Sequence, residues 1–216
     1  MPTIDTILFD LDGTLINTND LIIESFLHTL DHFHPGEYNR EKVIEFIGPP
    51  LVDSFQSVDP GRVDEMVTHY REFNHRMHDE LVTEYVGVYE TIERLHKQGY
   101  KLAIVTTKIR KTAMMGLQLM KLDQFFDVVI GLDDVKHAKP HPEPLEKALE
   151  QLGSKKKSSM MVGDSHSDIL SGKNLGIPTV AVAWSIKGMD KVKSFGADYI
   201  IDEMAELLPI VGADHK

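Results

Sequence analysis

Short apolar runs alternate along the chain with segments of helical periodicity. The runs are rich in Ile, Val and Leu and lack polar alternation, which is typical of strands buried on both faces of a sheet. The segments between them carry apolar side chains at helical spacing and end at glycines, which often terminate helices. This alternation predicts a doubly wound, mostly parallel, Rossmann-like α/β sheet. The expected strands are Thr6–Phe9, Lys101–Val105, Asp127–Ile130, Ser159–Val162, Thr179–Trp184 and Tyr199–Ile201.

One long segment breaks this rhythm directly after the first expected strand. Between residues 16 and 85 the sequence shows no pattern of a buried strand, and helical patterns are separated by turns that contain Pro and Gly. We therefore expect a small all-α domain at residues 16–85, inserted into an α/β core made of residues 1–15 and 86–216. The helical patterns span Asp20–His32, Asn39–Phe46 and Gly61–His78.

Composition narrows the classes of protein to consider. The 216 residues carry 34 acidic and 23 basic side chains, and the resulting net charge of −11 disfavours general nucleic-acid binding. There is no cysteine, which excludes a disulfide framework, a thiolate zinc site and a cysteine nucleophile. The sequence shows neither a signal-peptide pattern nor an apolar run long enough to span a membrane. We expect a cytoplasmic protein that binds neither nucleic acid nor a membrane.

Two carboxylates follow the first expected strand. Asp10 and Asp12 leave the strand on the same side because they are two residues apart, so both can face one site. Gly13 permits a sharp backbone turn beside them. Ordinary turns also favour Asp, because its side chain bonds to nearby backbone groups. Taken alone, the pair is compatible with either interpretation.

Polar residues follow other expected strands as well. Thr106 and Thr107 come after the second strand, where a hydroxyl and free N–H groups at a helix start either bind phosphate oxygens or cap the helix. Lys139 lies in a proline-rich approach to a helix and could hold a phosphoryl group as a fixed positive charge. Asp164 and Asp168 follow the fourth strand and resemble an oxygen-ligand site for Mg²⁺.

The placement of these residues is more informative than each residue alone. All of them stand at or just beyond the carboxyl ends of expected parallel strands, where open α/β sheets bind ligands. If the strand order is 3-2-1-4-5, the first, second and fourth strands are neighbours. The polar residues that follow those strands then converge in one crevice, and Lys139 reaches in from a loop.

In order and spacing, these motifs resemble those of the haloacid dehalogenase-like hydrolases. The segment DLDGT at 10–14 is similar to the first motif of the family, Thr106 to the second, Lys139 to the third and GDSHSD at 163–168 to the fourth. The resemblance covers essentially the whole chain and implies that the helical insertion is the cap domain of the family. The second acid, Asp12, resembles the phosphatases of the family, because true dehalogenases lack it.

The resemblance also implies a mechanism and a cofactor. It implies an aspartyl-phosphate intermediate on Asp10, with Asp12 as general acid and then general base, and Mg²⁺ as cofactor. Phosphoryl oxygens would be held by Thr106, Thr107 and Lys139. The metal ligands that the resemblance implies are Asp10, the backbone carbonyl of Asp12, Asp164 and, as a direct or indirect partner, Asp168.

Two subfamilies resemble this chain most, and they imply different substrates. Phosphoglycolate phosphatases and the PpaX-type inorganic pyrophosphatases of Gram-positive bacteria share a cap loop, although a simple turn between helices would look similar. The segments TILFDLDGTLINTNDLI at 6–22 and VTTKIRKTAMMGL at 105–117 favour the PpaX type. The resemblance therefore implies pyrophosphate as substrate, with phosphoglycolate or another small phosphate ester as the alternative. The residues of the possible specificity loop are Ile47, Gly48, Pro49 and Pro50.

Two functions without catalysis also fit parts of the pattern. Receiver domains of signalling proteins gather Asp, Thr and Lys around Mg²⁺, but they carry the phosphate acceptor on the third strand. Here Asp133 and Asp134 follow the third strand in a different context, and receiver domains have no helical insertion. A silent phosphate-binding module would be expected to have lost one of the motif residues, and all of them are present.

Overall fold

The computed structural model describes residues 4–213 and divides the chain into two compact units. The larger unit consists of Met1–Ile16 and Glu84–Lys216, and the smaller unit is Asn17–Thr83. These divisions differ by one and two residues from the boundaries expected at 15/16 and 85/86. Within residues 4–213, none of the helices combines the length and the apolar character that a membrane span requires.

A six-stranded parallel sheet forms the centre of the larger unit. Its strands are β1 (Thr6–Phe9), β4 (Lys101–Val105), β5 (Val128–Ile130), β6 (Ser159–Gly163), β7 (Thr179–Val182) and β8 (Tyr199–Ile201). Their order is β5-β4-β1-β6-β7-β8, and every neighbouring pair is parallel. This confirms the expected doubly wound α/β fold, with the predicted order extended by a sixth strand.

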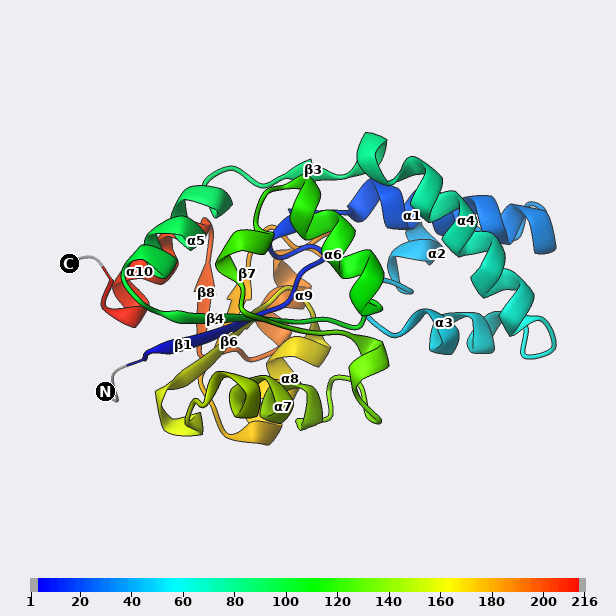
Figure 1. The fold of residues 1–216 in the computed structure, drawn as a ribbon. Coiled ribbons are helices and arrows are strands. Elements are labelled where there is room, and N and C mark those ends of the chain that lie inside the picture. Colours follow the sequence, from blue (N-terminus) through cyan, green and yellow to red (C-terminus); the bar gives the residue numbers. More distant parts are fainter. Residues whose placement is uncertain (1–3, 214–216) are drawn as a thin grey trace. The chain divides into compact units, whose positions relative to one another are not determined.

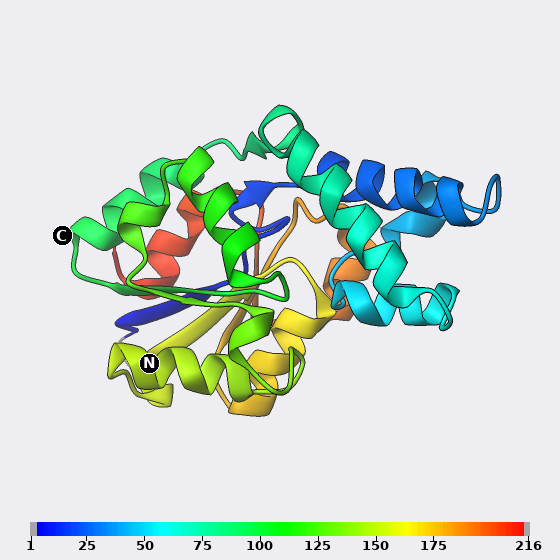
Figure 2. The ribbon, with the colours of Figure 1, turned by 45° about the vertical axis from the view of Figure 1, so that its right-hand side comes forward.

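Helices cover both faces of this sheet. Figure 1 and Figure 2 show α5 (Val88–Lys97) and α6 (Arg110–Leu119) on one face, and α7 (Glu143–Leu152) and α8 (His166–Leu175) on the other. Because both faces are covered, β1 is completely buried, which explains why its sequence shows no polar alternation. The other described elements of this unit are α9 (Met189–Ser194), α10 (Leu207–Val211) and short 3₁₀ turns at Asp123–Phe125, Leu132–Asp134, Lys156–Ser158 and Met204–Glu206.

The smaller unit is helical. Its helices are α1 (Asn19–Phe33), α2 (Arg40–Ile44), α3 (Leu51–Val58) and α4 (Val63–Leu81). An aromatic cluster holds them together, because the Phe26 ring lies 4.9 Å from that of Tyr70 and 5.4 Å from those of Phe46 and Phe55. Two short strands, β2 (Ile16–Asn17) and β3 (Thr83–Glu84), pair where the chain enters and leaves this unit.

Helix α3 is the one helix of this unit that the sequence did not predict. Leu51, Phe55 and Val58 follow helical spacing, but the helix has only eight residues and buries only Ser54 and Phe55, so its apolar pattern is short. The three expected helical patterns correspond to α1, α2 and α4, with ends that differ by one to three residues.

Helix α8 approaches the sheet closely at Gly172. A Cβ atom built on Gly172 would lie 2.5 Å from Thr179 Cγ2 and 3.2 Å from Met161 Cβ. The Thr179 side chain is fixed, because its hydroxyl donates a hydrogen bond of 2.8 Å to Asp198 Oδ2. A methyl group at position 172 therefore meets a side chain that cannot turn away without losing this bond.

We expect Gly172→Ala to lower the free energy of unfolding by about 1–2 kcal/mol, because overpacking outweighs the better helix propensity of alanine. Thr179→Ser removes the clashing methyl group and keeps the hydroxyl, so Gly172→Ala should cost much less in that background. Urea unfolding of the two single variants, the double variant and the parent protein measures both costs. Equal costs in the two backgrounds would contradict the close contact as the cause.

Candidate active site

A buried lysine ammonium lies at the carboxyl ends of the central strands. Lys139 Nζ lies 2.7 Å from Asp10 Oδ1 and 2.6 Å from Asp168 Oδ1, and it donates a hydrogen bond of 2.7 Å to the Val105 carbonyl oxygen. The Lys139 side chain is only 2% exposed. Asp10 follows β1, Val105 ends β4 and Asp168 lies in α8, so one ammonium group links three elements of the core.

Three buried carboxylates gather beside this ammonium group. Asp10, Asp164 and Asp168 each place one oxygen within 4.8 Å of the other two, and all three residues are buried. When all three are ionised, the single positive charge of Lys139 leaves an excess of negative charge. A buried set of carboxylate oxygens is the ligand type that Mg²⁺ prefers, so the residues fit the cofactor expected from the sequence.

The pKa values of Asp10, Asp164 and Lys139 reflect this excess of negative charge. Burial raises the pKa of the Asp10 carboxyl well above its ordinary value, although the Lys139 ammonium acts in the opposite direction. Burial and then the charge of Asp168 raise the pKa of Asp164 to about 7. Burial alone would lower the pKa of Lys139, but Asp10 and Asp168 outweigh it and raise that pKa. The lysine is therefore charged at neutral pH, whereas Asp10 and Asp164 need further positive charge to be fully ionised.

Both carboxylate oxygens of Asp168 have protein partners. Oδ2 accepts hydrogen bonds from the backbone N–H and the hydroxyl of Ser165, at 3.0 and 2.6 Å, and Oδ1 receives Lys139. The Ser165 hydroxyl oxygen accepts in turn from the Asp168 N–H at 3.3 Å, which completes a capping box at the start of α8. Asp168 thus fixes the ammonium group and the helix start together.

Asp164 closely approaches the turn that follows β1, at Gly13. The backbone of Gly13 has φ +78°, and a Cβ atom built there would lie 2.7 Å from Asp164 Oδ2. A larger residue would strain the backbone and displace the carboxylate. The same Oδ2 atom accepts a hydrogen bond of 3.1 Å from the Ser185 hydroxyl. The turn that the sequence predicts at Gly13 therefore also makes room for a site carboxylate.

Asp12 has a different partner from Asp10. Its Oδ1 lies 2.6 Å from Lys108 Nζ, and the two side chains are 16% and 15% exposed. Among the described residues 4–213, the three carboxylates that could hold a metal together belong to Asp10, Asp164 and Asp168, and the Asp12 side chain is not one of them. The resemblance implies a role on the metal for the Asp12 backbone carbonyl, and that role stays a prediction.

The two threonines expected to bind phosphate lie directly after β4. Thr106 is buried, and its Oγ1 accepts a hydrogen bond of 3.1 Å from the Lys108 N–H. Helix α6 begins at Arg110 with Ile109 at the N-cap position, so Thr106 does not cap it. Thr107 is half-buried beside it. The alternative of a simple helix cap is therefore wrong for Thr106, whereas phosphate binding stays a prediction.

Sequence reasoning missed two polar side chains of the site. Lys108 follows Thr107, and Ser185 comes shortly after β7 ends at Val182. Both therefore stand beyond the carboxyl end of a parallel strand, the signal that singled out the other residues. The residues of the possible specificity loop, Ile47, Gly48, Pro49 and Pro50, are not part of this group, because they lie between α2 and α3 in the helical unit.

The two carboxylates that follow β5 accept hydrogen bonds from backbone N–H groups of the same unit. Asp133 Oδ1 accepts a hydrogen bond of 2.7 Å from the Arg110 N–H, and Asp134 Oδ2 accepts one of 2.9 Å from the Gly131 N–H. Both side chains thus satisfy backbone donors near the start of α6 and of the turn after β5. A phosphate acceptor at these positions, as in a receiver domain, is disfavoured.

Proteins named pyrophosphatase are similar to this chain along nearly its whole length. "Pyrophosphatase PpaX" of Bacillus mycoides (strain KBAB4) is 60% identical over 208 residues, which is 96% of this chain and 97% of the relative. The protein of the same name from Anoxybacillus flavithermus is 61% identical over 213 residues, 99% of each chain.

Solved structures and a family model agree with this relationship. A haloacid dehalogenase-like family hydrolase from Streptococcus pneumoniae superposes with a TM-score of 0.86 at 26% identity, covering 97% of this chain and 99% of the other. A protein from Haemophilus somnus described as a predicted phosphoglycolate phosphatase gives 0.83 at 27% identity, covering 96% and 97%. The model of the haloacid dehalogenase-like hydrolases matches residues 7–182. The chain therefore belongs to the haloacid dehalogenase-like hydrolase family.

Proposed function

We propose that this hydrolase is a Mg²⁺-dependent phosphatase whose preferred substrate is inorganic pyrophosphate. The observation that carries the chemistry is the buried Lys139 ammonium between Asp10 and Asp168 at the carboxyl edge of the sheet. The identity of about 60%, along nearly the full length, to proteins named pyrophosphatase supports pyrophosphate as the substrate.

Asp10 is the proposed nucleophile. Its Oδ1 is held by Lys139, which leaves the other carboxylate oxygen to attack phosphorus in line. The bond from phosphorus to the bridging oxygen breaks, phosphate leaves, and an acyl phosphate remains on Asp10. Water then attacks that phosphorus, the second phosphate leaves, and the Asp10 carboxylate is restored.

Lys139, Thr106 and Thr107 are proposed to hold oxygens of the transferring phosphoryl group. Lys139 provides a charge whose position is fixed before the substrate binds, because three acceptors surround its ammonium group. The hydroxyl of Thr106 lies at the end of the neighbouring strand β4. A phosphate oxygen of the substrate would take the place of one of the three acceptors that now surround the ammonium group.

The metal site that we propose uses Asp10, Asp164 and the backbone carbonyl of Asp12. When bound there, Mg²⁺ neutralises charge on the phosphate oxygens and on the buried aspartates. Asp168 is assigned an indirect part, because its two oxygens already receive Lys139 and Ser165. It orients the lysine that faces the same phosphate.

Asp12 is proposed to protonate the leaving group and then to activate water, with Lys108 as its positioning residue. The ion pair of 2.6 Å holds the Asp12 carboxylate at one place beside the strand ends. Phosphate is a better leaving group than an alkoxide, so the protonation step matters less for pyrophosphate than for a phosphate ester.

The helical unit is proposed to act as the cap that selects the substrate. Its loop between α2 and α3, with the residues Ile47, Gly48, Pro49 and Pro50, resembles a loop of related phosphatases and is proposed to contribute to that selection. A cytoplasmic location, expected from the sequence, is part of the same proposal. Phosphoglycolate remains the second candidate substrate, because a structural neighbour with 27% identity carries that name.

The test of this function compares two substrates under identical conditions. Phosphate release with Mg²⁺ is measured from pyrophosphate and from phosphoglycolate, with Asp10→Asn protein as the blank. We expect kcat/KM to favour pyrophosphate by at least about tenfold, a difference of roughly 1.4 kcal/mol in activation free energy, and the blank to be inactive. Preference for phosphoglycolate would overturn the substrate, and activity in the blank would overturn the nucleophile.

Asp164→Asn is expected to stabilise the metal-free protein at pH 8. The folded protein binds a proton at Asp164 more tightly than the unfolded chain does. The ionisation of Asp164 therefore lowers the free energy of unfolding as pH rises from about 4 to about 7, and the full loss persists at higher pH. Asparagine carries no charge, and the gain in unfolding free energy at pH 8 is on the order of 2–4 kcal/mol. Thermal unfolding in EDTA at pH 8 and pH 4 measures it.

The same variant tests the metal site without an activity assay. Mg²⁺ should raise the melting temperature of the parent protein at pH 8 and change that of Asp164→Asn much less. A variant that is less stable than the parent in EDTA at pH 8, or that gains as much from Mg²⁺, would contradict this assignment of Asp164.

Lys108→Met is expected to lower kcat/KM for pyrophosphate by about 10–100-fold, because hydrogen bonds to charged groups are typically worth about 1.5–3 kcal/mol. Lys111→Met is the matched control, since Lys111 is an exposed lysine three residues further along the chain. Its kcat/KM should stay within about twofold of the parent value. If Lys108→Met behaved like the control, Lys108 would have no part in positioning Asp12.

A further inference from the structure

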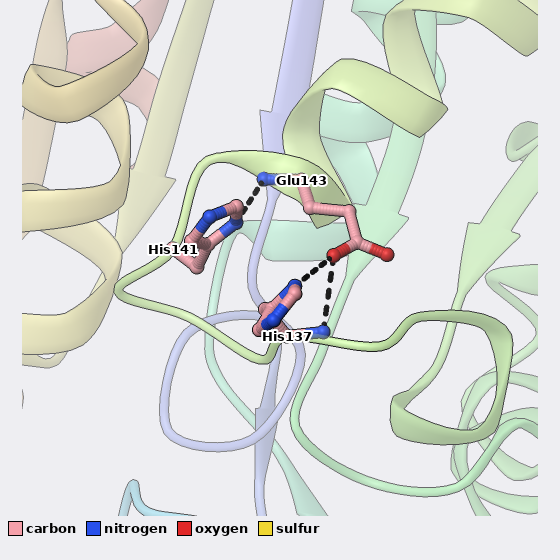
Figure 3. Close-up of side chains that lie close together, drawn as sticks. All are labelled: His137, His141 and Glu143. Carbon is pink, nitrogen blue, oxygen red and sulfur yellow. Dashed lines mark hydrogen bonds and ion pairs between the residues drawn. The ribbon is translucent and has the colours of Figure 1, made fainter.

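A second group of metal-binding side chains lies on the segment that carries Lys139. His137, His141 and Glu143 each place one potential ligand atom within 4.8 Å of the others. The two imidazole rings lie 4.6 Å apart between centroids, and both histidines are exposed. Figure 3 shows the His137 ring and the Glu143 carboxylate pointing toward one another, with the His141 ring beside them. The group is distinct from Asp10, Asp164 and Asp168.

The Glu143 carboxylate is already oriented by its neighbours. Its Oε1 accepts a hydrogen bond of 2.8 Å from the Lys136 N–H, and its Oε2 accepts one of 3.0 Å from the His137 N–H. The Lys136 N–H bond and then the His137 side chain hold the pKa of this carboxyl below its ordinary value. Backbone donors of this kind fix the direction of a metal-binding carboxylate and leave lone pairs free on both oxygens.

The His137 ring and the Glu143 carboxylate lie close enough to become neighbouring ligands of one ion. His137 Nδ1 lies 2.7 Å from Glu143 Oε2, so one proton occupies the position that a cation could take. Zinc–nitrogen and zinc–oxygen bonds of about 2.0–2.2 Å would require only a small separation of these atoms. The His141 ring must give up the hydrogen bond of 3.1 Å that its Nδ1 accepts from the Glu143 N–H.

Backbone restraint lowers the entropic cost of assembling these ligands. Pro140 and Pro142 flank His141, and Pro144 follows Glu143, so the backbone around two of the ligands has few conformations to lose. Two imidazoles and one carboxylate suit a borderline cation such as Zn²⁺, whereas the three buried aspartates suit a hard cation such as Mg²⁺. The two groups should therefore select different metals.

We propose that His137, His141 and Glu143 form a site for Zn²⁺ or a similar divalent transition-metal ion, with water completing the tetrahedral coordination. Binding through Nδ1 puts the ion in place of the hydrogen between His137 and Glu143. A neutral ring then carries its one proton on Nε2, whereas a protonated ring releases one proton to solvent. Since two of the ligands lie two residues on either side of Lys139, the bound ion restrains the segment that presents this ammonium group to Asp10 and Asp168.

Titration calorimetry of the full chain with Zn²⁺ tests this site when Mg²⁺ is present in large excess. We expect one equivalent of Zn²⁺ to bind, and to bind more tightly at about pH 7.5 than at about pH 5.5, because metal ligands must be deprotonated. His137→Ala and His141→Ala should each weaken binding at least about tenfold, a loss of roughly 1.4 kcal/mol. Hydrogen exchange of residues 136–143 should slow on addition of Zn²⁺ in the parent protein and not in these variants.

Two controls separate this site from its competitors. His32→Ala removes one ring from the stacked histidines His28, His69 and His32 of the helical unit and should leave binding unchanged. Asp164→Asn alters the buried aspartates and should also leave it unchanged. The proposal is overturned if no Zn²⁺ binds, if binding survives both His137→Ala and His141→Ala, or if either control abolishes it. Unchanged melting temperatures of the histidine variants without Zn²⁺ show that they are folded.

Discussion

The site depends on one buried positive charge, the ammonium group of Lys139. Taking a charge out of water is costly, and such a group is stable only with close partners of opposite sign. Here the partners come from the end of β1, the end of β4 and the first turn of α8. Removing one partner of a buried pair typically costs about 3–5 kcal/mol, so the position of the lysine is coupled to the packing of the core.

The parallel register of the sheet brings these partners to one level. Phe9 of β1 lies opposite Ile104 of β4 and Val162 of β6, so the three strands end side by side. Residues more than a hundred positions apart in the sequence thus leave the sheet at the same edge. The sheet supplies the geometry, and the excess of carboxylates over ammonium groups creates the demand for a divalent cation. That cation in turn reduces the repulsion between the carboxylates and an anionic substrate.

Much of this arrangement could be predicted from local patterns. Strands buried on both faces show continuous apolar runs, and the polar residues at their ends follow directly in the sequence, as Asp10 and Thr106 do. Helix α3 was harder to predict, because its eight residues carry only one short set of helically spaced apolar positions, Leu51, Phe55 and Val58. The sequence predicts that the strand ends at Trp184, two residues after the observed end of β7 at Val182, because the apolar run continues past the last ladder residue.

The choice of partners within the site could not be predicted. The sequence places Asp10, Asp12 and Asp168 near one another, but it does not say that Lys139 contacts the first and third while Lys108 takes the second. That choice depends on how far each side chain reaches across the strand ends, which only the folded packing decides. The same holds for Ser185, whose hydroxyl reaches Asp164 from the neighbouring strand end.

The central claim is that Asp10 becomes phosphorylated during turnover. The most direct measurement uses Asp12→Ala protein, in which loss of the proposed base should slow the attack of water. The protein is mixed with pyrophosphate and Mg²⁺, quenched with acid and reduced with borohydride, which converts an aspartyl phosphate to homoserine that peptide mass spectrometry locates. The account predicts homoserine at position 10 alone. Homoserine at position 164 or 168, or turnover with no modified aspartate, would contradict it.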